Sequence, residues 1–197
     1  SYDVILEIFE ISKKQGIRSV DKICHRMELG KDTYTLGKIR PEMEEELCRV
    51  LADFVRIMEG YRVDDYRATA SSAISEASNS LYVLGKIHQL TGLSVTVLSN
   101  SEQRFLSYKA LAAMEDNFNK IIEKGTAILD LDGGSFQISL FDKDALVTTQ
   151  NIRMGSLRIR ERLAGIQSET EHYEEMVEEL IWNEVSSFKK MYLKDRK

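Results

Sequence analysis

Apolar and polar residues are distributed in a way that predicts a β-hairpin at the start of the chain. Residues 4–11 are rich in β-branched side chains and begin to alternate, and residues 17–27 carry a weaker version of the same pattern. Between them, residues 13–16 (K-K-Q-G) have the composition of a turn. We therefore expect two antiparallel strands. Because the first strand starts so close to Ser1, we also expect further strand residues to precede it.

A helical pattern begins at Pro41, a residue that the first turn of a helix tolerates because the missing N–H is unpaired there anyway. Apolar residues recur at helical spacing from Leu47 to Met58, and Gly60 is expected to cap the C-terminus. The first turn is rich in carboxylates, which suit the helix dipole: Glu42, Glu44, Glu45 and Glu46.

The rest of the chain alternates between short strands and helices. The pattern predicts strands over residues 94–98, 126–131, 136–141 and 145–149, and helices near 74, over 80–90, from 99, over 157–163 and over 169–194. Hairpins mixed with crossover helices are typical of α/β or α+β folds. We expect two lobes, residues 1–122 and 123–197.

Composition excludes several classes of protein. The 197 residues carry a formal net charge of −5, which excludes a generally basic nucleic-acid binder and leaves room for a local anion site. No apolar run approaches the roughly 20 residues that cross a bilayer, so no membrane association is expected. Cys24 and Cys48 form no metal-binding or disulfide pattern, and we expect two reduced, partly buried thiols in a cytoplasmic protein.

The clearest chemical signal is the loop Asp132-Gly133-Gly134-Ser135 between two predicted strands. Its glycines let backbone N–H groups approach an anion, and the serine adds a hydroxyl donor. Asp130 lies two residues earlier and therefore on the same side of the strand as Asp132. A carboxylate beside a phosphate-binding loop suits a magnesium ion. The alternative is an ordinary hairpin turn with solvated aspartates.

Other candidate residues have equally simple structural explanations. Glu102 follows a strand and opens a helix, where a carboxylate either activates a water or stabilises the helix N-terminus. A basic cluster after the third strand of the second lobe is either a solvated face or a path for a polyanion: Arg153, Arg158, Arg160 and Arg162. The three histidines are far apart and lack the spacing of metal ligands: His25, His88 and His172.

In their order, five segments resemble the exopolyphosphatase / guanosine pentaphosphate phosphatase (Ppx/GppA) family: residues 28–39 (E-L-G-K-D-T-Y-T-L-G-K-I), 70–77 (A-S-S-A-I-S-E-A), 98–102 (L-S-N-S-E), 130–135 (D-L-D-G-G-S) and 154–158 (M-G-S-L-R). The resemblance implies an α/β, actin-like (acetate and sugar kinase/Hsc70/actin, ribonuclease-H-like) two-lobe fold with phosphate bound between the lobes. Relatives start with another strand and an Asp-x-Gly-Ser-Asn-Ser loop and continue past the last residue here, so the resemblance implies a chain truncated at both ends.

The resemblance also implies roles for particular residues. Glu102 matches the glutamate that activates the attacking water, Asp130 matches the carboxylate on the magnesium (Mg2+) side, and Gly133, Gly134 and Ser135 match the phosphate-binding loop. The implied function is a phosphoanhydride hydrolase that releases phosphate from inorganic polyphosphate or guanosine pentaphosphate. A homodimer is implied in the same way.

Several family positions are substituted in this chain. Asp132 replaces a loop glycine, Gln137 replaces an acidic residue, Ser75 replaces an arginine and Gln103 replaces a glutamate, while Tyr2-Asp3 stands for Asn-Ser. Losing an arginine and adding a carboxylate both weaken polyanion binding. The alternative is therefore a degenerate member that binds a nucleotide, a polyphosphate or a protein partner without turnover. A kinase-like ATPase is a weaker alternative, because no adenosine-binding segment is recognisable.

Overall fold

The structure, a computed structural model, describes residues 2–115, 117–164 and 172–193. The chain packs as two compact units, Ser1–Leu98 and Ser99–Lys197. This packing boundary lies before the lobe boundary expected after residue 122. The helices between the two positions pack on the strands that follow them, as the Tyr108 side chain shows by donating a hydrogen bond to Ser139. Among the described residues, no helix combines the length and apolarity needed to span a membrane.

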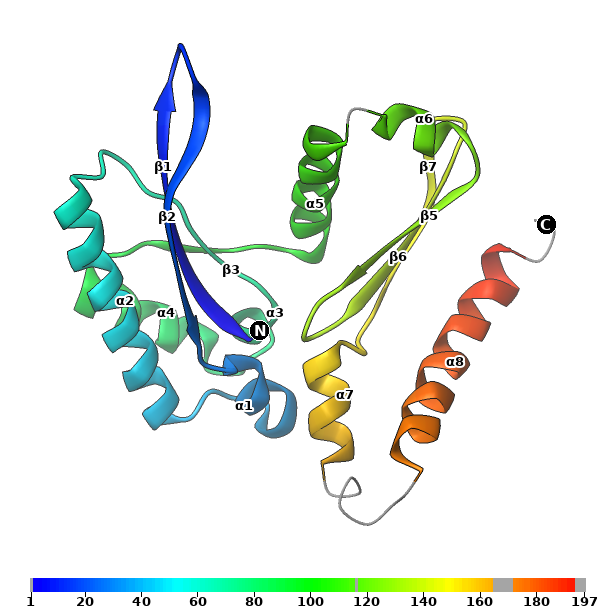
Figure 1. The fold of residues 1–197 in the computed structure, drawn as a ribbon. Coiled ribbons are helices and arrows are strands. Elements are labelled where there is room, and N and C mark those ends of the chain that lie inside the picture. Colours follow the sequence, from blue (N-terminus) through cyan, green and yellow to red (C-terminus); the bar gives the residue numbers. More distant parts are fainter. Residues whose placement is uncertain (1, 116, 165–171, 194–197) are drawn as a thin grey trace. The chain divides into compact units, whose positions relative to one another are not determined.

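The first unit opens with the expected hairpin (Figure 1). Strands β1 (Asp3–Ser12) and β2 (Gly16–Arg26) pair antiparallel, with a register irregularity between Ile8 and Phe9. Gly16 has a φ of 70° in the turn, a left-handed conformation that glycine adopts at little cost. The hairpin prediction is confirmed.

Helices and a short parallel strand pair complete the first unit. The elements are α1 (Leu29–Leu36), α2 (Pro41–Tyr61), β3 (Ala68–Ala70), α3 (Ser72–Ser75), α4 (Ser80–Thr91) and β4 (Val95–Val97), with β3 parallel to β4. Helix α2 begins at Pro41 as expected, but it continues through Gly60, and Arg62 supplies the left-handed cap instead. Helix α1 and strand β3 were not predicted, because each is short and α1 buries polar as well as apolar residues.

Charged side chains are buried at the edge of this unit's apolar core. Asp32 has a side chain only 2% exposed, and it accepts hydrogen bonds from the backbone N–H and the guanidinium of Arg40 at 2.9–3.0 Å. The same hydrogen bond and charge raise the pKa of Arg40. Asn79 joins the Ile39 backbone to Glu44 in a second buried set of bonds. These bonds fix the turn between α1 and α2, since a buried carboxylate needs its partners.

The second unit is a three-stranded sheet with helices on both faces. Its elements are α5 (Asn100–Met114), α6 (Phe118–Glu123), β5 (Thr126–Leu131), β6 (Phe136–Asp142), β7 (Ala145–Ile152), α7 (Ser156–Leu163) and α8 (Tyr173–Tyr192). The strands pair antiparallel in the order β5-β6-β7. All three strand predictions are confirmed, α6 was not predicted, and residues 169–171 and 194 of the expected last helix lie outside the described residues.

Alternation along β6 divides the two faces of this sheet. Ile138 and Leu140 join the apolar cluster built with α7 and α8, in which Phe188 is almost fully buried. Ser139 and Phe141 face α5, where the Tyr108 ring meets Phe141 edge-on at 5.4 Å between ring centroids. Helix α5 therefore packs over the face of the sheet opposite α8 (Figure 1).

We predict that Asp32→Asn destabilises the first unit by about 1–3 kcal/mol, because the amide removes a charge and turns one acceptor into a donor facing Arg40. Urea unfolding followed by circular dichroism measures the change. Asp53→Asn is the matched control: Asp53 pairs with Arg56, but the side chains are 60% and 74% exposed. That variant is expected to stay within about 0.5 kcal/mol of the wild type. Equal effects of the two substitutions would contradict the prediction.

We further predict that the two thiols differ in reactivity. Cys24 is exposed, whereas Cys48 is buried in α2, and that burial raises the pKa of its thiol. Iodoacetamide at pH 8 is expected to label Cys24 about tenfold faster or more in the folded protein, since the thiolate is the nucleophile. Peptide mass spectrometry measures both rates, and urea should make them converge. Labelling of native Cys48 as fast as Cys24 is the outcome that contradicts the prediction.

Candidate functional site

The loop between β5 and β6 is held by its own hydrogen bonds. The Asp132 N–H donates to the Ser135 carbonyl at 2.9 Å, and the Gly133 N–H donates to the Asp132 carboxylate at 2.6 Å. Gly133 and Gly134 are buried, while Asp132 and Ser135 are half-buried. The tight loop expected from the sequence is confirmed. One of its backbone donors, however, already binds a carboxylate of the loop itself.

The outer side of the loop is docked on the N-terminus of α7. The backbone N–H groups of Ser156 and Arg158 donate to the carbonyls of Asp132 and Gly133 at 3.1 and 3.0 Å. The Arg158 guanidinium adds a bond from Nε to the Gly134 carbonyl at 2.8 Å. The first-turn donors of the helix, which lack partners within the helix, are thus used to hold the loop.

This docking depends on the absence of a side chain at Gly155, the N-cap of α7. A Cβ at this position would lie 2.4 Å from the Asp132 oxygen, the Gly133 carbon and the Ser135 nitrogen. All three are backbone atoms, which cannot rotate away as a flexible side chain can. Gly155 therefore sets how closely the loop approaches the helix.

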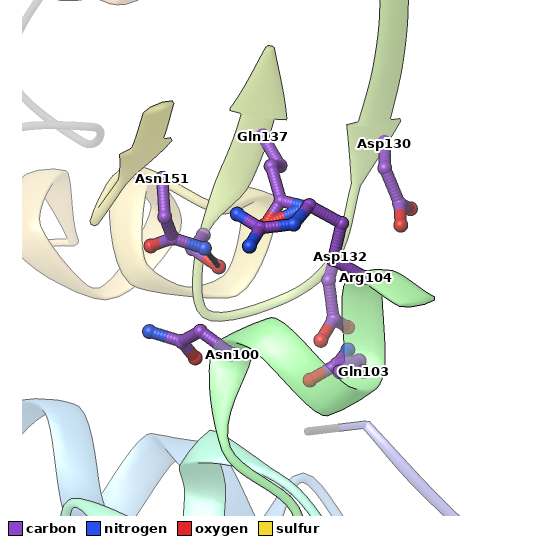
Figure 2. Close-up of a pocket in the computed structure, with 8 residues that line it drawn as sticks. Asn100, Gln103, Arg104, Asp130, Asp132, Gln137 and Asn151 are labelled. Carbon is purple, nitrogen blue, oxygen red and sulfur yellow. Dashed lines mark hydrogen bonds between the residues drawn. The ribbon is translucent and has the colours of Figure 1, made fainter. Parts of the chain in front are cut away.

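Side chains from α5 and from all three strands surround a hollow beside the loop (Figure 2). Its volume is about 270 Å³, including the open mouth. Helix α5 contributes Asn100, Gln103 and Arg104, and the strands and loop contribute Asp130, Asp132, Ser135, Gln137 and Asn151. Every lining side chain is polar or charged, which is unusual for a ligand pocket and suits a small hydrophilic ligand.

Strand register explains why these residues meet. Asp130 lies directly opposite Gln137, and Gln137 lies directly opposite Asn151. The three residues therefore form one row across the sheet, on the face that carries α5. On the helix, Asn100, Gln103 and Arg104 have the i, i+3, i+4 spacing that places side chains on one face.

The expected site residues are only partly brought together. Asp130, Asp132 and Ser135 line the hollow, whereas Gly133 and Gly134 form the loop behind it. Asn151 donates from Nδ2 to the Ser135 hydroxyl at 3.1 Å, so Ser135 is held in place by the neighbouring strand. Their roles in binding phosphate stay predictions.

Glu102 does not belong to the residues that line the hollow. Its carboxylate accepts hydrogen bonds from the backbone N–H and hydroxyl of Ser99, both at 2.8 Å, and the Ser99 hydroxyl accepts the Glu102 N–H at 3.2 Å. This capping box confirms the helix-terminal interpretation of Glu102. A second, catalytic role stays a prediction.

Two arginines of the basic cluster have structural contacts. Arg158 holds the loop, and Arg160 pairs with Glu161 at 2.8 Å. The cation that the sequence analysis missed is Arg104, which lines the hollow from α5. The helical spacing of Arg104 with Asn100 and Gln103 could have indicated that the three side chains share one face of α5. The sequence does not show that this face lies next to Asp130, because that depends on the register of the strands.

The donors in the hollow fit a magnesium ion. Asp130 and Asp132 supply carboxylate oxygens, and the amides of Gln137 and Asn151 add neutral oxygens. Magnesium uses one or two carboxylates and completes its shell with water and phosphate oxygens. Across residues 2–115, 117–164 and 172–193, no group of three or more His, Cys, Asp or Glu side chains could hold a metal alone, so a ligand would have to complete the shell.

With this geometry established, comparison with known proteins identifies the family. A model of the Ppx/GppA phosphatase family matches residues 7–196. The chain belongs to this family. The resemblance of the five short segments is thereby confirmed over nearly the whole chain.

Individual relatives of this Ppx/GppA chain are distant. Exopolyphosphatase 1 of Mycobacterium leprae is 29% identical over 108 residues, which are 54% of this chain and 30% of the relative. A bifunctional 3-dehydroquinate synthase/phosphatase of Fusobacterium nucleatum is 20% identical over 147 residues, which are 74% of this chain and 22% of the relative. The chain thus spans less than a third of these curated relatives.

Solved structures establish the fold. The crystal structure of an exopolyphosphatase-like protein superposes with a TM-score of 0.77 at 18% identity, covering 96% of this chain and 58% of that one. The Ppx/GppA phosphatase of Aquifex aeolicus, in a type II variant, gives a TM-score of 0.64 at 22% identity, covering 95% and 60%. The expected actin-like α/β fold is confirmed.

We predict that Gly155→Ala destabilises the second unit of this Ppx/GppA chain by about 1–3 kcal/mol, because the new methyl group overlaps three backbone atoms. Urea unfolding followed by circular dichroism measures the change in the free energy of unfolding. Gly125→Ala is the control, since a Cβ there meets nothing within 4 Å. If the two variants unfold at the same urea concentration, the loop does not need the close approach.

Proposed function

We propose that the protein is an exopolyphosphatase-like phosphoanhydride hydrolase that releases phosphate from inorganic polyphosphate or guanosine pentaphosphate. The observation that carries the proposal is the hollow itself: the family's glycine loop, two carboxylates and a guanidinium converge in a chain that the family model matches from residue 7 to 196. Phosphoryl transfer requires mainly positioning and charge stabilisation, and these groups supply both.

The lining of the hollow favours the end of a phosphate chain as ligand. Every lining side chain is polar or charged, and none offers the apolar or aromatic surface on which a nucleobase would pack. Polyphosphate is therefore the preferred substrate, and exopolyphosphatase is also the name of one relative. Guanosine pentaphosphate would need contacts outside this hollow. We also propose a cytoplasmic location and a homodimer, in line with the family resemblance.

Magnesium is the proposed cofactor, with Asp130 as its protein ligand. When bound, the ion would neutralise negative charge on the phosphate oxygens. Ser135 and the loop of Gly133 and Gly134 would bind the terminal phosphoryl group, with the Ser135 hydroxyl already oriented by Asn151. Asp132 is a less suitable phosphate contact, because its carboxylate repels the anion and already accepts the Gly133 N–H.

Glu102 is the proposed base that orients and deprotonates the attacking water. It is exposed in the first turn of α5. In the sequence it lies between Asn100 and Gln103, two residues that line the hollow. The capping box with Ser99 limits the motion of its side chain. A base that is held in place in this way contributes about 10²- to 10⁴-fold to a rate.

The test of this proposal is phosphate release from long-chain polyphosphate by the intact protein with magnesium. Glu102→Gln is expected to lower kcat by about 100-fold or more. Because glutamine also completes a capping box, the helix is expected to stay intact, and the melting temperature should change little. Phosphate release is measured colorimetrically beside thermal unfolding of both proteins.

Ser99→Ala is the matched control for Glu102→Gln. It removes the cap from the other side of the same box, which is expected to cost about 1 kcal/mol of stability. Its kcat is expected to fall much less than that of Glu102→Gln, because the carboxylate is retained and the Ser99 backbone N–H still binds it. Activity of Glu102→Gln equal to that of the wild type would disprove the role of Glu102. No phosphate release by the wild type from either substrate would disprove the hydrolase, and binding without release would support the degenerate alternative.

A further inference from the structure

We infer that Arg104 is the residue that binds the non-bridging oxygens of the terminal phosphoryl group in the hollow. The inference rests on the proposed function, because it names the group of the substrate that this site would take. The family resemblance assigned no role to Arg104.

Arg104 contributes a positive charge to the hollow. It is the one basic side chain among the residues that line the hollow, and two carboxylates, Asp130 and Asp132, line the same hollow. Nevertheless, within the described part of the chain, Arg104 forms no ion pair. Its two hydrogen bonds run to neutral hydroxyls: Nη1 to Thr149 Oγ1 and Nη2 to Ser101 Oγ, both at 3.3 Å.

These hydroxyls position the guanidinium before any ligand arrives. Thr149 Oγ1 is also 3.0 Å from the Ser139 hydroxyl, which is almost fully buried and accepts a bond from the Tyr108 hydroxyl. Tyr108 lies one turn further along α5 than Arg104, so the chain of hydroxyls connects the helix to β6 and β7. A guanidinium has five donors, and these two long bonds leave donors for an anion.

The charges in the hollow are separated. In Figure 2 the Arg104 guanidinium extends toward the Asn151 side, while the Asp130 carboxylate lies at the opposite side. The Asn151 amide and the Ser135 hydroxyl line the same hollow as the guanidinium. A phosphoryl group with a magnesium ion matches both sides: its oxygens would bind the guanidinium, and the ion would bind Asp130. The planar fork of arginine suits such oxygens in pairs.

The inference is tested by isothermal titration of methylenediphosphonate, a condensed phosphate analogue that cannot be hydrolysed, into the intact protein with magnesium. Arg104→Gln is expected to weaken binding by about 10- to 100-fold, the loss expected for charge-assisted hydrogen bonds. Arg104→Lys keeps the charge but lacks the planar guanidinium, and its affinity should lie between those of the wild type and Arg104→Gln. Lys109→Gln removes the same charge from the same helix outside the hollow and should stay within about twofold.

Thr149 tests the positioning of Arg104 separately. Thr149→Val removes the hydroxyl at nearly constant shape and is expected to weaken binding about 3- to 10-fold, whereas Thr149→Ser should restore wild-type affinity. Melting temperatures of all variants show whether the fold is retained.

Two results would overturn the inference: wild-type affinity in Arg104→Gln, or equal losses in Arg104→Gln and Lys109→Gln. Absence of binding to the wild type would overturn it as well. Failure of the proposed function looks different, because the analogue would then bind in an Arg104-dependent way while polyphosphate releases no phosphate.

Discussion

The contact between the glycine loop and the N-terminus of α7 is the constraint on which the second unit depends. Helix N-termini usually offer free N–H groups to anions. Here the N–H groups of Ser156 and Arg158 bind loop carbonyls instead, and the Gly133 N–H binds the Asp132 carboxylate. These backbone donors are therefore engaged without a ligand. Side-chain donors gain importance for the same reason, and Arg104 is the charged one in the hollow.

Much of the fold could be predicted from the sequence, since local patterns determine most of its elements. The opening hairpin, helix α2 and the three strands of the second unit follow from alternation, helical spacing and turn residues. Helix α1 was not predicted, because it buries Asp32. Burial of this carboxylate is compensated by the ion pair with Arg40, a tertiary contact that the local sequence pattern does not show. Strand β3 pairs with three residues of β4 far along the chain, and short strands of this kind carry little local signal.

Only those parts of the candidate site whose residues are close together in the sequence could be predicted. The loop and Asp130 are close in sequence, and the structure keeps them together. Asn151 and Arg104 join them through strand register and helix packing, which no local pattern encodes. Glu102 illustrates the converse: its position after a strand suggested chemistry, and the same position gives it a capping box. A residue at a helix start can hold a structural role whether or not it also acts on a substrate.

The charge balance within the hollow gives Arg104 its importance. Asp130 and Asp132 both contribute carboxylates to the lining, and the family resemblance implies a glycine at the position of Asp132. A polyanion entering the hollow thus meets two carboxylates, whose repulsion must be offset locally because the low dielectric of a partly enclosed site screens charges poorly. Arg104, uncompensated by an ion pair among the described residues, is placed to offset part of it. It is carried by a helix anchored to the sheet by Tyr108, and rigid support of this kind keeps binding groups in position.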